Sequence, residues 1–395
     1  MLTVDLARVA FARFAVPEPE PEPEPELEPE PEPEPEPGSE LERGPGPALV
    51  PAHASEHVSE HVSEQAGPGV WTGEERLIGF AATQIVPSWT ARTPPGSWIE
   101  IALRARTTQG DLTKWYVMGR WSEHGDPRTS VPGQGDEDGD VAVDTFVARR
   151  PVVAYQVRVT RYGEGARVTG LGVMASALPR TPVVASAAVT AEPVELAVPR
   201  HSQHAHAGHH PRYDGGGANW CSPASVAMVL GFWGRGPAPG ELGWVGDGDP
   251  APGVDHAAAG AYDDSYQGTG NWPFNVAYAG RYDLAGFVTR LRSAAELESF
   301  VRAGIPVITS LSFKERELPG SCYTTNGHIL VVIGFTAGGD VVVNDPAAPC
   351  DAEVRRVYPR AAFEHVWLRS SGSGGIVYVL HPPEIPLPPC TNGNW

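Results

Sequence analysis

The sequence predicts an α+β domain in its second half, preceded by an all-β sandwich domain. Residues 70–178 contain short segments in which apolar and polar residues alternate, separated by turns rich in Gly, Pro and Asp. Residues 198–382 instead contain two helix-like segments, followed by the apolar runs "IPVITSLSF", "GHILVVIGF" and "DVVVND". Alternation with period two is typical of half-buried strands, and helices followed by strands favour the α+β class.

Length and charge narrow the classes of partner. A chain of 395 residues is long enough for two globular units with accessory segments. The formal net charge of -19 comes largely from a Pro-Glu tract, so the rest of the chain is only mildly acidic, and we expect no nucleic-acid partner. Apolar runs stay short of the roughly 18–20 residues that span a bilayer, so we expect no membrane span.

Residues 1–69 are predicted to be a disordered acidic segment. Proline and glutamate alternate over residues 17–37, which favours an extended polyproline-II rod. This rod is either a spacer or a solvated tail. The stretch "MLTVDLARVAFARFAV" is too interrupted by Arg and Asp to resemble a secretion signal. Acidic Pro-Glu spacers are nevertheless common in exported bacterial proteins, so we expect a secreted or cell-wall location, with the cytoplasm as the alternative.

Two features of the predicted β-sandwich have both a structural and a functional interpretation. Its tryptophans suit either a buried core or a platform that stacks on cell-wall glycan; they are Trp89, Trp98, Trp115 and Trp121. Asp136, Asp138 and Asp140 resemble half a calcium loop that lacks the downstream bidentate Glu, and an acidic turn is the simpler interpretation.

The second unit is expected to follow a proline-punctuated linker over residues 179–197 and to precede a tail over residues 383–395. In "SAAELESFVRAG", Ser293 and Glu296 form a capping box, and Gly304 marks the end of the helix. The segment "YDDSYQGTGNWPFNVAYAG", residues 262–280, has neither helical nor strand period, so we expect a loop. Such a loop suits the wall of a substrate groove, with Asn271 and Trp272 as candidates together with Trp220.

Cys221 is placed at the start of the helix predicted from "SPASVAMVLGFWG". Unpaired N–H groups and the dipole at a helix start favour a thiolate, and Pro223 suits the first turn. A buried structural thiol is the alternative for this segment taken alone.

His328 and Asp345 are predicted to be neighbours in a β-hairpin. If Thr336 to Gly339 form its turn, Asp345 falls opposite Leu330, which shares a sheet face with His328. A tighter turn would separate the two side chains. In the first register, a carboxylate orients an imidazole that can act as the base for a cysteine.

Three segments resemble the bacteriocin-processing type of peptidase, family thirty-nine of the cysteine peptidases, within the papain-like superfamily. They are "GGGANWCSPASVAMVL", "NGHILVVIGF" and "VVVNDPAA", and the likeness is greatest to stand-alone secreted bacterial members. The resemblance implies a papain-like fold. It also implies Cys221 as nucleophile, His328 as base and Asp345 as the orienting residue.

The family also uses a glutamine in the oxyanion hole, just before the cysteine. Gln203 is the candidate, although the insertion "HAHAGHHPRYDGGGANW" separates it from Cys221, and Asn219 is the alternative. Asn344 is the alternative third member of the triad, but we expect it to face the other side of its strand. Ser222 stands where the family usually has glycine.

Histidines are concentrated in and just before the inserted segment. They could bind a transition metal only if several converge, which a loop gives little reason to expect; they are His201, His204, His206, His209 and His210. We therefore expect no metal and no cofactor. Cys322 and Cys350, or Cys350 and Cys390, are candidate disulfides in an oxidising compartment.

Together, these residues predict a cysteine peptidase that acts on a peptide or protein through an acyl-enzyme. The alternatives are an amidase or acyltransferase on cell-wall peptides, and a binding protein that keeps an inactive peptidase fold.

Overall fold

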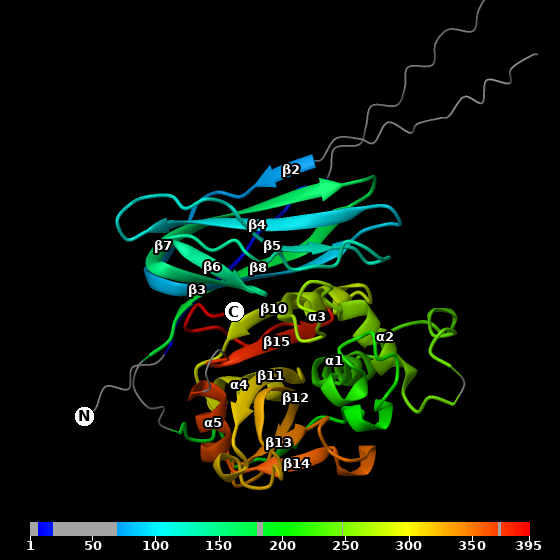
Figure 1. The fold of residues 1–395 in the computed structure, drawn as a ribbon. Coiled ribbons are helices and arrows are strands. Elements are labelled where there is room, and N and C mark those ends of the chain that lie inside the picture. The colour runs from blue at the N-terminus through cyan, green and yellow to red at the C-terminus, as the bar shows by residue number, and fades with distance from the viewer. Residues whose placement is uncertain (1–6, 19–68, 180–184, 247, 370–372) are drawn as a thin grey trace, which may run out of the picture.

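A computed structural model describes residues 7–18, 69–179, 185–246, 248–369 and 373–395. Figure 1 shows two β-sheet units in contact, with all the labelled helices around the second sheet. The coarse prediction of an α+β chain therefore agrees with the structure, which has two antiparallel sheets with helices around the second.

The first unit is a single hydrogen-bonded antiparallel sheet in the order β1-β8-β3-β7-β4-β5, and β2 and β6 both pair with β7. Its strands are β1 (Arg8–Arg13), β2 (Gly69–Thr72), β3 (Arg76–Arg92), β4 (Trp98–Thr107), β5 (Tyr116–Trp121), β6 (Gly139–Ala142), β7 (Thr145–Tyr162) and β8 (Arg167–Ala177). We expected a sandwich of two sheets. The strands stay linked because β3 and β7 are long enough to pair with different neighbours along their length.

The second unit is an antiparallel sheet in the order β10-β15-β11-β12-β13-β14, with β9 paired to β12. Its strands are β9 (Val194–Glu195), β10 (Ala285–Arg290), β11 (Val307–Phe313), β12 (Thr325–Phe335), β13 (Val341–Asn344), β14 (Arg355–Tyr358) and β15 (Ile376–His381). Its helices are α1 (Cys221–Phe232), α2 (Pro252–Ala261), α3 (Trp272–Gly280), α4 (Ala294–Arg302) and α5 (Arg360–Arg369).

Helices cover both faces of this sheet, and the side chains of β12 alternate between them. Ile329 and Val331 join the apolar cluster that contains α1 and α3, whereas Leu330 and Val332 join the cluster of α4 and α5. Helix α1 packs against β12 and α2, and most of its side chains are buried, so its N-terminus is held rigidly at the edge of the sheet.

The two units share one apolar core. Phe274 of α3 is fully buried, and its ring centroid lies 6.0 Å from that of Trp89 and 5.3 Å from that of Trp121 in the first unit. The backbone N–H of Val288 in β10 donates to Ser88 Oγ of β3 at 2.9 Å. The first unit is therefore packed onto α3 and onto β10, the edge strand of the second sheet.

Several segments are more ordered than their composition indicates. Residues 8–13, which we expected to be disordered, form β1: the strand pairs with β8, Val9 is buried, and the half-buried Phe11 packs on the core. The expected tail also packs: the ring centroids of Trp395 and Phe300 lie 5.0 Å apart. Within the expected linker, β9 pairs with β12.

Residues 272–280 form helix α3, where we expected a loop. Asn271 is the N-cap and accepts a hydrogen bond from the N–H of Phe274, and Pro273 occupies the first turn. Every residue from Pro273 to Gly280 is buried, so the helix has no polar face and its sequence shows no amphipathic period. Among the described residues, no helix has the length and apolar character needed to cross a bilayer.

Candidate active site

Cys221 is the first residue of α1 and is half-buried beside a pocket of about 900 Å³. His328, Gln203 and Trp272 line the same pocket. A helix begins here because Pro223 in the first turn needs no N–H partner and apolar residues follow it. Ser222, at the position where the resembled family has glycine, is buried with its Oγ 3.4 Å from the Tyr378 hydroxyl.

His328 is held by Asp345. Its Nε2 lies 2.8 Å from Asp345 Oδ1, which leaves Nδ1 as the free ring nitrogen. The other carboxylate oxygen of Asp345, Oδ2, accepts hydrogen bonds from the hydroxyls of Tyr323 at 2.9 Å and Tyr358 at 2.7 Å. His328 is 5% exposed and Asp345 is fully buried, so the orientation of the imidazole is fixed.

The electrostatics of this pair favour opposite charges. Burial lowers the pKa of His328, but the charge and hydrogen bond of Asp345, with a smaller contribution from Cys221, raise it to about 10. Burial raises the pKa of Asp345, but His328 and the two tyrosine hydroxyls lower it to about 2. The two pKa shifts have opposite directions, and both favour the form of the pair with a carboxylate and an imidazolium.

A β-bulge brings His328 and Asp345 together. Val331 pairs with Asn344, so the register places Asp345 opposite Leu330, as we predicted. The turn itself is longer than predicted, because Phe335 pairs with Val341 rather than with Asp340. The register shift between Val332 and Gly334 compensates for the extra turn residue.

Gln203 is positioned by the segment that follows β13. Its backbone N–H donates to the carbonyl of Pro346 at 2.9 Å, which ties it to the loop next to Asp345. Its side-chain Nε2 donates to the Ala218 carbonyl at 2.5 Å, and its Oε1 is buried without a partner. One amide hydrogen orients the side chain, so the second remains available to the pocket.

The alternative residues are placed elsewhere or used differently. Asn344 donates to the carbonyls of Val198 and Pro199, so it faces away from His328 as expected. Asn219 lines the pocket but donates its amide to the Asp214 carbonyl at 2.8 Å.

Two of the three groove candidates are core residues. Trp220 is fully buried and packs against α2 in a small apolar cluster. Its Nε1 donates to the Tyr213 carbonyl. Asn271 is 1% exposed and serves as the cap of α3. Trp272 alone of the three lines the pocket.

The first unit supplies part of the pocket wall. Val143, Asp144 and Thr145 in the β6–β7 turn line the pocket, and Asp144 Oδ2 accepts from the Trp272 N–H at 3.0 Å. Burial raises the pKa of Asp144 to about 6, although the hydrogen bonds from Trp272 and Thr145 oppose this. Val143 has φ +59°, a region that β-branched residues rarely adopt.

Sequence reasoning missed this turn and the two tyrosines that hold Asp345. No local pattern marks the turn, because it enters the site through packing between the two units. Tyr323 had a weak signal in the sequence, because it precedes His328 by five residues. Tyr358 lies in β14, and the pairing of β14 with β13 brings it near Asp345.

The placement of the tryptophans and of the acidic turn in the first unit favours structural roles for them. Trp89 and Trp121 are fully buried, which removes them from a glycan platform. Asp136 Oδ1 accepts from the backbone N–H groups of Asp138 and Gly139, and Asp138 pairs with Arg150, so these residues form an acidic turn.

All four cysteines lie in the described part of the chain, and each is free. The two candidate disulfides are therefore absent. Cys350 and Cys390 have near neighbours in their own loops, Glu353 and Asn394 respectively, instead of each other.

Two of the inserted histidines converge with two aspartates, contrary to our expectation. His206 and His209 lie next to Asp249 and Asp255, outside the residues that line the Cys221 pocket. Both aspartates lie in or just before α2, and their distance from the histidines in the chain hid the cluster from sequence reasoning.

Two family models and a solved structure are similar to parts of this chain. The model of the peptidase C39 N-terminal domain matches residues 37–176, and that of the peptidase C39 like family matches residues 195–374. A solved structure from Bacillus anthracis, provisionally described as a C39-like peptidase, has 21% identity and a TM-score of 0.31, covering 48% of this chain and 97% of that chain. No curated protein matches the chain.

The two matching models are both of the C39 peptidase type, and they match successive parts of the chain. The chain belongs to the C39-like peptidase family. This membership supports a peptidase function.

Proposed function

We propose that this chain is a cysteine peptidase in which Cys221 is the nucleophile, His328 the acid and base, and Asp345 the residue that orients His328. The observation that carries the proposal is the placement of His328 between two groups. Its Nε2 contacts Asp345 at 2.8 Å, and its ring shares a pocket with Cys221. Family membership supports a peptidase but does not by itself identify the nucleophile.

In the proposed first step, the Cys221 sulfur attacks the carbonyl carbon of the peptide bond. His328 gives the proton on Nδ1 to the leaving amine, since Nε2 is occupied by Asp345. Water then attacks the thioester while His328 takes up its proton. The acid product leaves and the sulfur departs as a thiolate, so the starting pair of a Cys221 thiolate and a protonated His328 is restored.

The developing oxyanion needs donors that are fixed before the reaction begins. Gln203 Nε2 suits this role because its bond to the Ala218 carbonyl already fixes the amide plane. Cys221 begins α1, and the first N–H groups of a helix have no partner within the helix. Together these groups would stabilise the tetrahedral intermediate.

The substrate class is an extended peptide. Residues at the start of β12, including Asn326 and Gly327, line one side of the pocket, and Trp272 lines it together with the β6–β7 turn. A pocket bounded by both units suits a chain that passes between them more than a compact small molecule. We assign no side-chain preference.

Thiol reactivity tests the proposal without knowledge of the substrate. Cys322 and Cys350 are exposed, whereas Cys221 is half-buried, so accessibility alone predicts slower alkylation of Cys221. We expect iodoacetamide, with mass spectrometry to locate the adducts, to modify Cys221 first near neutral pH. His328→Ala should slow modification of Cys221 and leave Cys322 unchanged. Reactivity that follows exposure in both proteins would refute the proposal.

Product analysis then identifies the reaction. The full chain, Cys221→Ala and the matched control Cys322→Ala are incubated with a peptide library and with cell-wall fragments. New peptide ends that require Cys221 and not Cys322 indicate a peptidase. Products only from the cell-wall fragments would instead favour the amidase alternative. If none of the three proteins gives products and Cys221 is alkylated slowly, the result would favour an inactive binding protein.

A further inference from the structure

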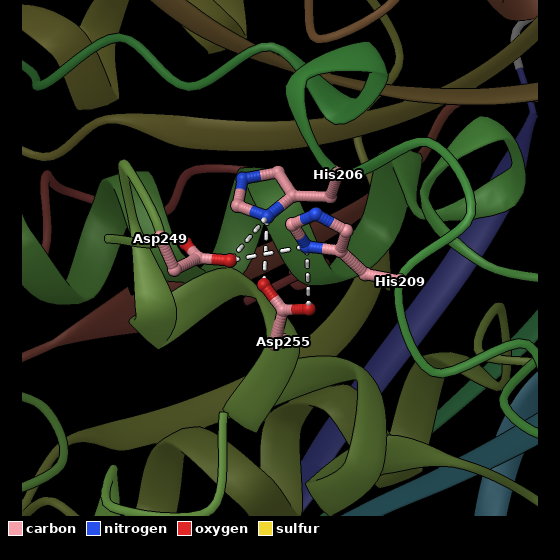
Figure 2. Close-up of side chains that lie close together, drawn as sticks. All are labelled: His206, His209, Asp249 and Asp255. Carbon is pink, nitrogen blue, oxygen red and sulfur yellow. Dashed lines mark hydrogen bonds and ion pairs between the residues drawn. The ribbon is translucent and has the colours of Figure 1, made fainter. Parts of the chain in front are cut away.

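A cluster of two imidazoles and two carboxylates lies between the segment after β9 and the start of α2. Figure 2 shows His206, His209, Asp249 and Asp255 pointing toward one another. His206 belongs to the 3-10 helix η1 (Gln203–His206), and Asp255 belongs to the first turn of α2. One donor atom from each residue lies within 4.8 Å of the other three.

The two carboxylates are buried in a way that requires a positive partner. The side chain of Asp255 is fully buried and that of Asp249 is 4% exposed. Asp249 Oδ2 is a buried atom without a hydrogen-bond partner, and it points at His206 and His209. Within the described ranges, no lysine or arginine forms an ion pair with either aspartate. Buried charge without compensation is strongly unfavourable.

We propose that these four residues bind a divalent transition-metal ion, with zinc as the best fit. A tetrahedral zinc ion has bonds of about 2.0–2.2 Å to nitrogen and oxygen, so neighbouring ligand atoms are about 3.3–3.6 Å apart. The separations between imidazole Nδ1 and a carboxylate oxygen are 2.7, 3.0, 3.2 and 3.6 Å, with Asp255 presenting Oδ2 to His206 and Oδ1 to His209. With one donor atom taken from each residue, all four lie within 4.8 Å of one another, so small shifts of the side chains would bring them to one ion.

The donor set also selects the class of metal. Two imidazoles favour zinc, iron, copper or nickel over magnesium and calcium, which prefer oxygen ligands. Two carboxylates balance the charge of a divalent ion when both imidazoles are neutral. The alternative is a hydrogen-bonded network in which both histidines carry an extra proton instead.

Four protein ligands would close the coordination sphere, so the ion would have a structural role. It would connect η1 to the start of α2, two segments far apart in the chain. Gln203 is the first residue of η1, three positions before His206, so the same ion would anchor the segment that carries it. The metal site does not depend on the proposed peptidase mechanism.

The test measures metal binding in the full chain with Cys221 replaced by Ala, because a thiol and an imidazole in the pocket can also bind zinc. After removal of metal by a chelator and dialysis, we expect one Zn²⁺ per chain by elemental analysis and calorimetry. Co²⁺ should give the intense visible bands of a tetrahedral site. Zinc X-ray absorption should show nitrogen and oxygen ligands with imidazole scattering and no sulfur.

Ligand variants locate the site. His209→Ala and Asp249→Asn should each weaken Zn²⁺ binding by at least about 100-fold. Loss of a residue that only hydrogen-bonds to a metal ligand already lowers the affinity for the metal by about 10–100-fold. His204→Ala is the matched control, since His204 is exposed on the same short helix but outside the cluster. It should keep the parent affinity.

Three results would overturn the proposal. The first is no Zn²⁺ or Co²⁺ bound by the Cys221→Ala chain, which would leave the hydrogen-bonded network. The second is binding that His209→Ala and Asp249→Asn leave unchanged. The third is an octahedral Co²⁺ spectrum without imidazole scattering. The spectra come from the chain with intact ligands, so they decide the question even if a ligand variant fails to fold.

Discussion

The pair formed by His328 and Asp345 leads to a quantitative prediction for Asp345→Asn. The substitution keeps the shape of the side chain and an acceptor for the hydroxyls of Tyr323 and Tyr358, but it removes the charge that holds the His328 proton. The pKa of His328 is raised from 6.5 to about 10 in the folded chain. At about 1.4 kcal/mol per tenfold change, this difference is worth roughly 5 kcal/mol of folding free energy.

The sign follows from the two pKa values. The pKa of His328 is raised, so its stabilisation is complete below pH 6.5 and is lost as the pH rises through about 10. The pKa of Asp345 is lowered from 3.8 to about 2, so its stabilisation is complete above pH 3.8 and is lost as the pH falls through about 2. The advantage of the wild-type chain over Asp345→Asn should therefore be greatest between pH 3.8 and pH 6.5.

Urea unfolding of both proteins measures this advantage. The difference in unfolding free energy should be roughly 5 kcal/mol at about pH 6 and about 1–2 kcal/mol at about pH 9, because the imidazolium is progressively lost. Tryptophan fluorescence and circular dichroism are followed together to verify one shared transition. Imidazole ¹⁵N NMR should show His328 titrating near pH 10 in the wild type. A difference that stays constant between these pH values, or a His328 titration below pH 7, would refute the charged pair.

Three further substitutions test other parts of the structure. Gln203→Ala should lower kcat by about 100–1000-fold with little change in KM, and an unchanged kcat in steady-state assays would exclude an oxyanion role. Phe274→Ala, which empties the contact with Trp89 and Trp121, should cost about 3–5 kcal/mol in urea unfolding. Val143→Gly relieves the φ of +59°, so Tm should not fall while KM rises; a lower Tm would argue against strain in this turn.

Local chemistry made several elements predictable from the sequence. Ser293 caps α4 by accepting from the N–H of Glu296, and Gly304 follows the helix with φ +81°. Both features depend on a few neighbouring residues. The start of the helix at Cys221 was predictable for the same reason.

Long-range packing explains what could not be predicted. Helix α3 is buried on all sides, so no amphipathic period reveals it. The closeness of His328 and Asp345 was expected, but the longer turn and the compensating bulge between Val332 and Gly334 were not; the bulge falls where β9, a distant segment, pairs with β12. The partners of His206 lie in another loop, so spacing in the sequence carries no signal for the cluster.

The first strand changes how the Pro-Glu tract must be regarded. β1 precedes the tract and pairs with β8, whereas β2 follows it and pairs with β7 of the same sheet. The tract is thus an insertion tethered at both borders instead of a dangling arm. A protease that cuts within it should leave two fragments that co-purify, because β1 stays bound through its backbone and through the contact of Phe11 with Phe287. Removal of the residues before β2 would take away the edge strand β1 and uncover Phe287, which the Phe11 ring contacts.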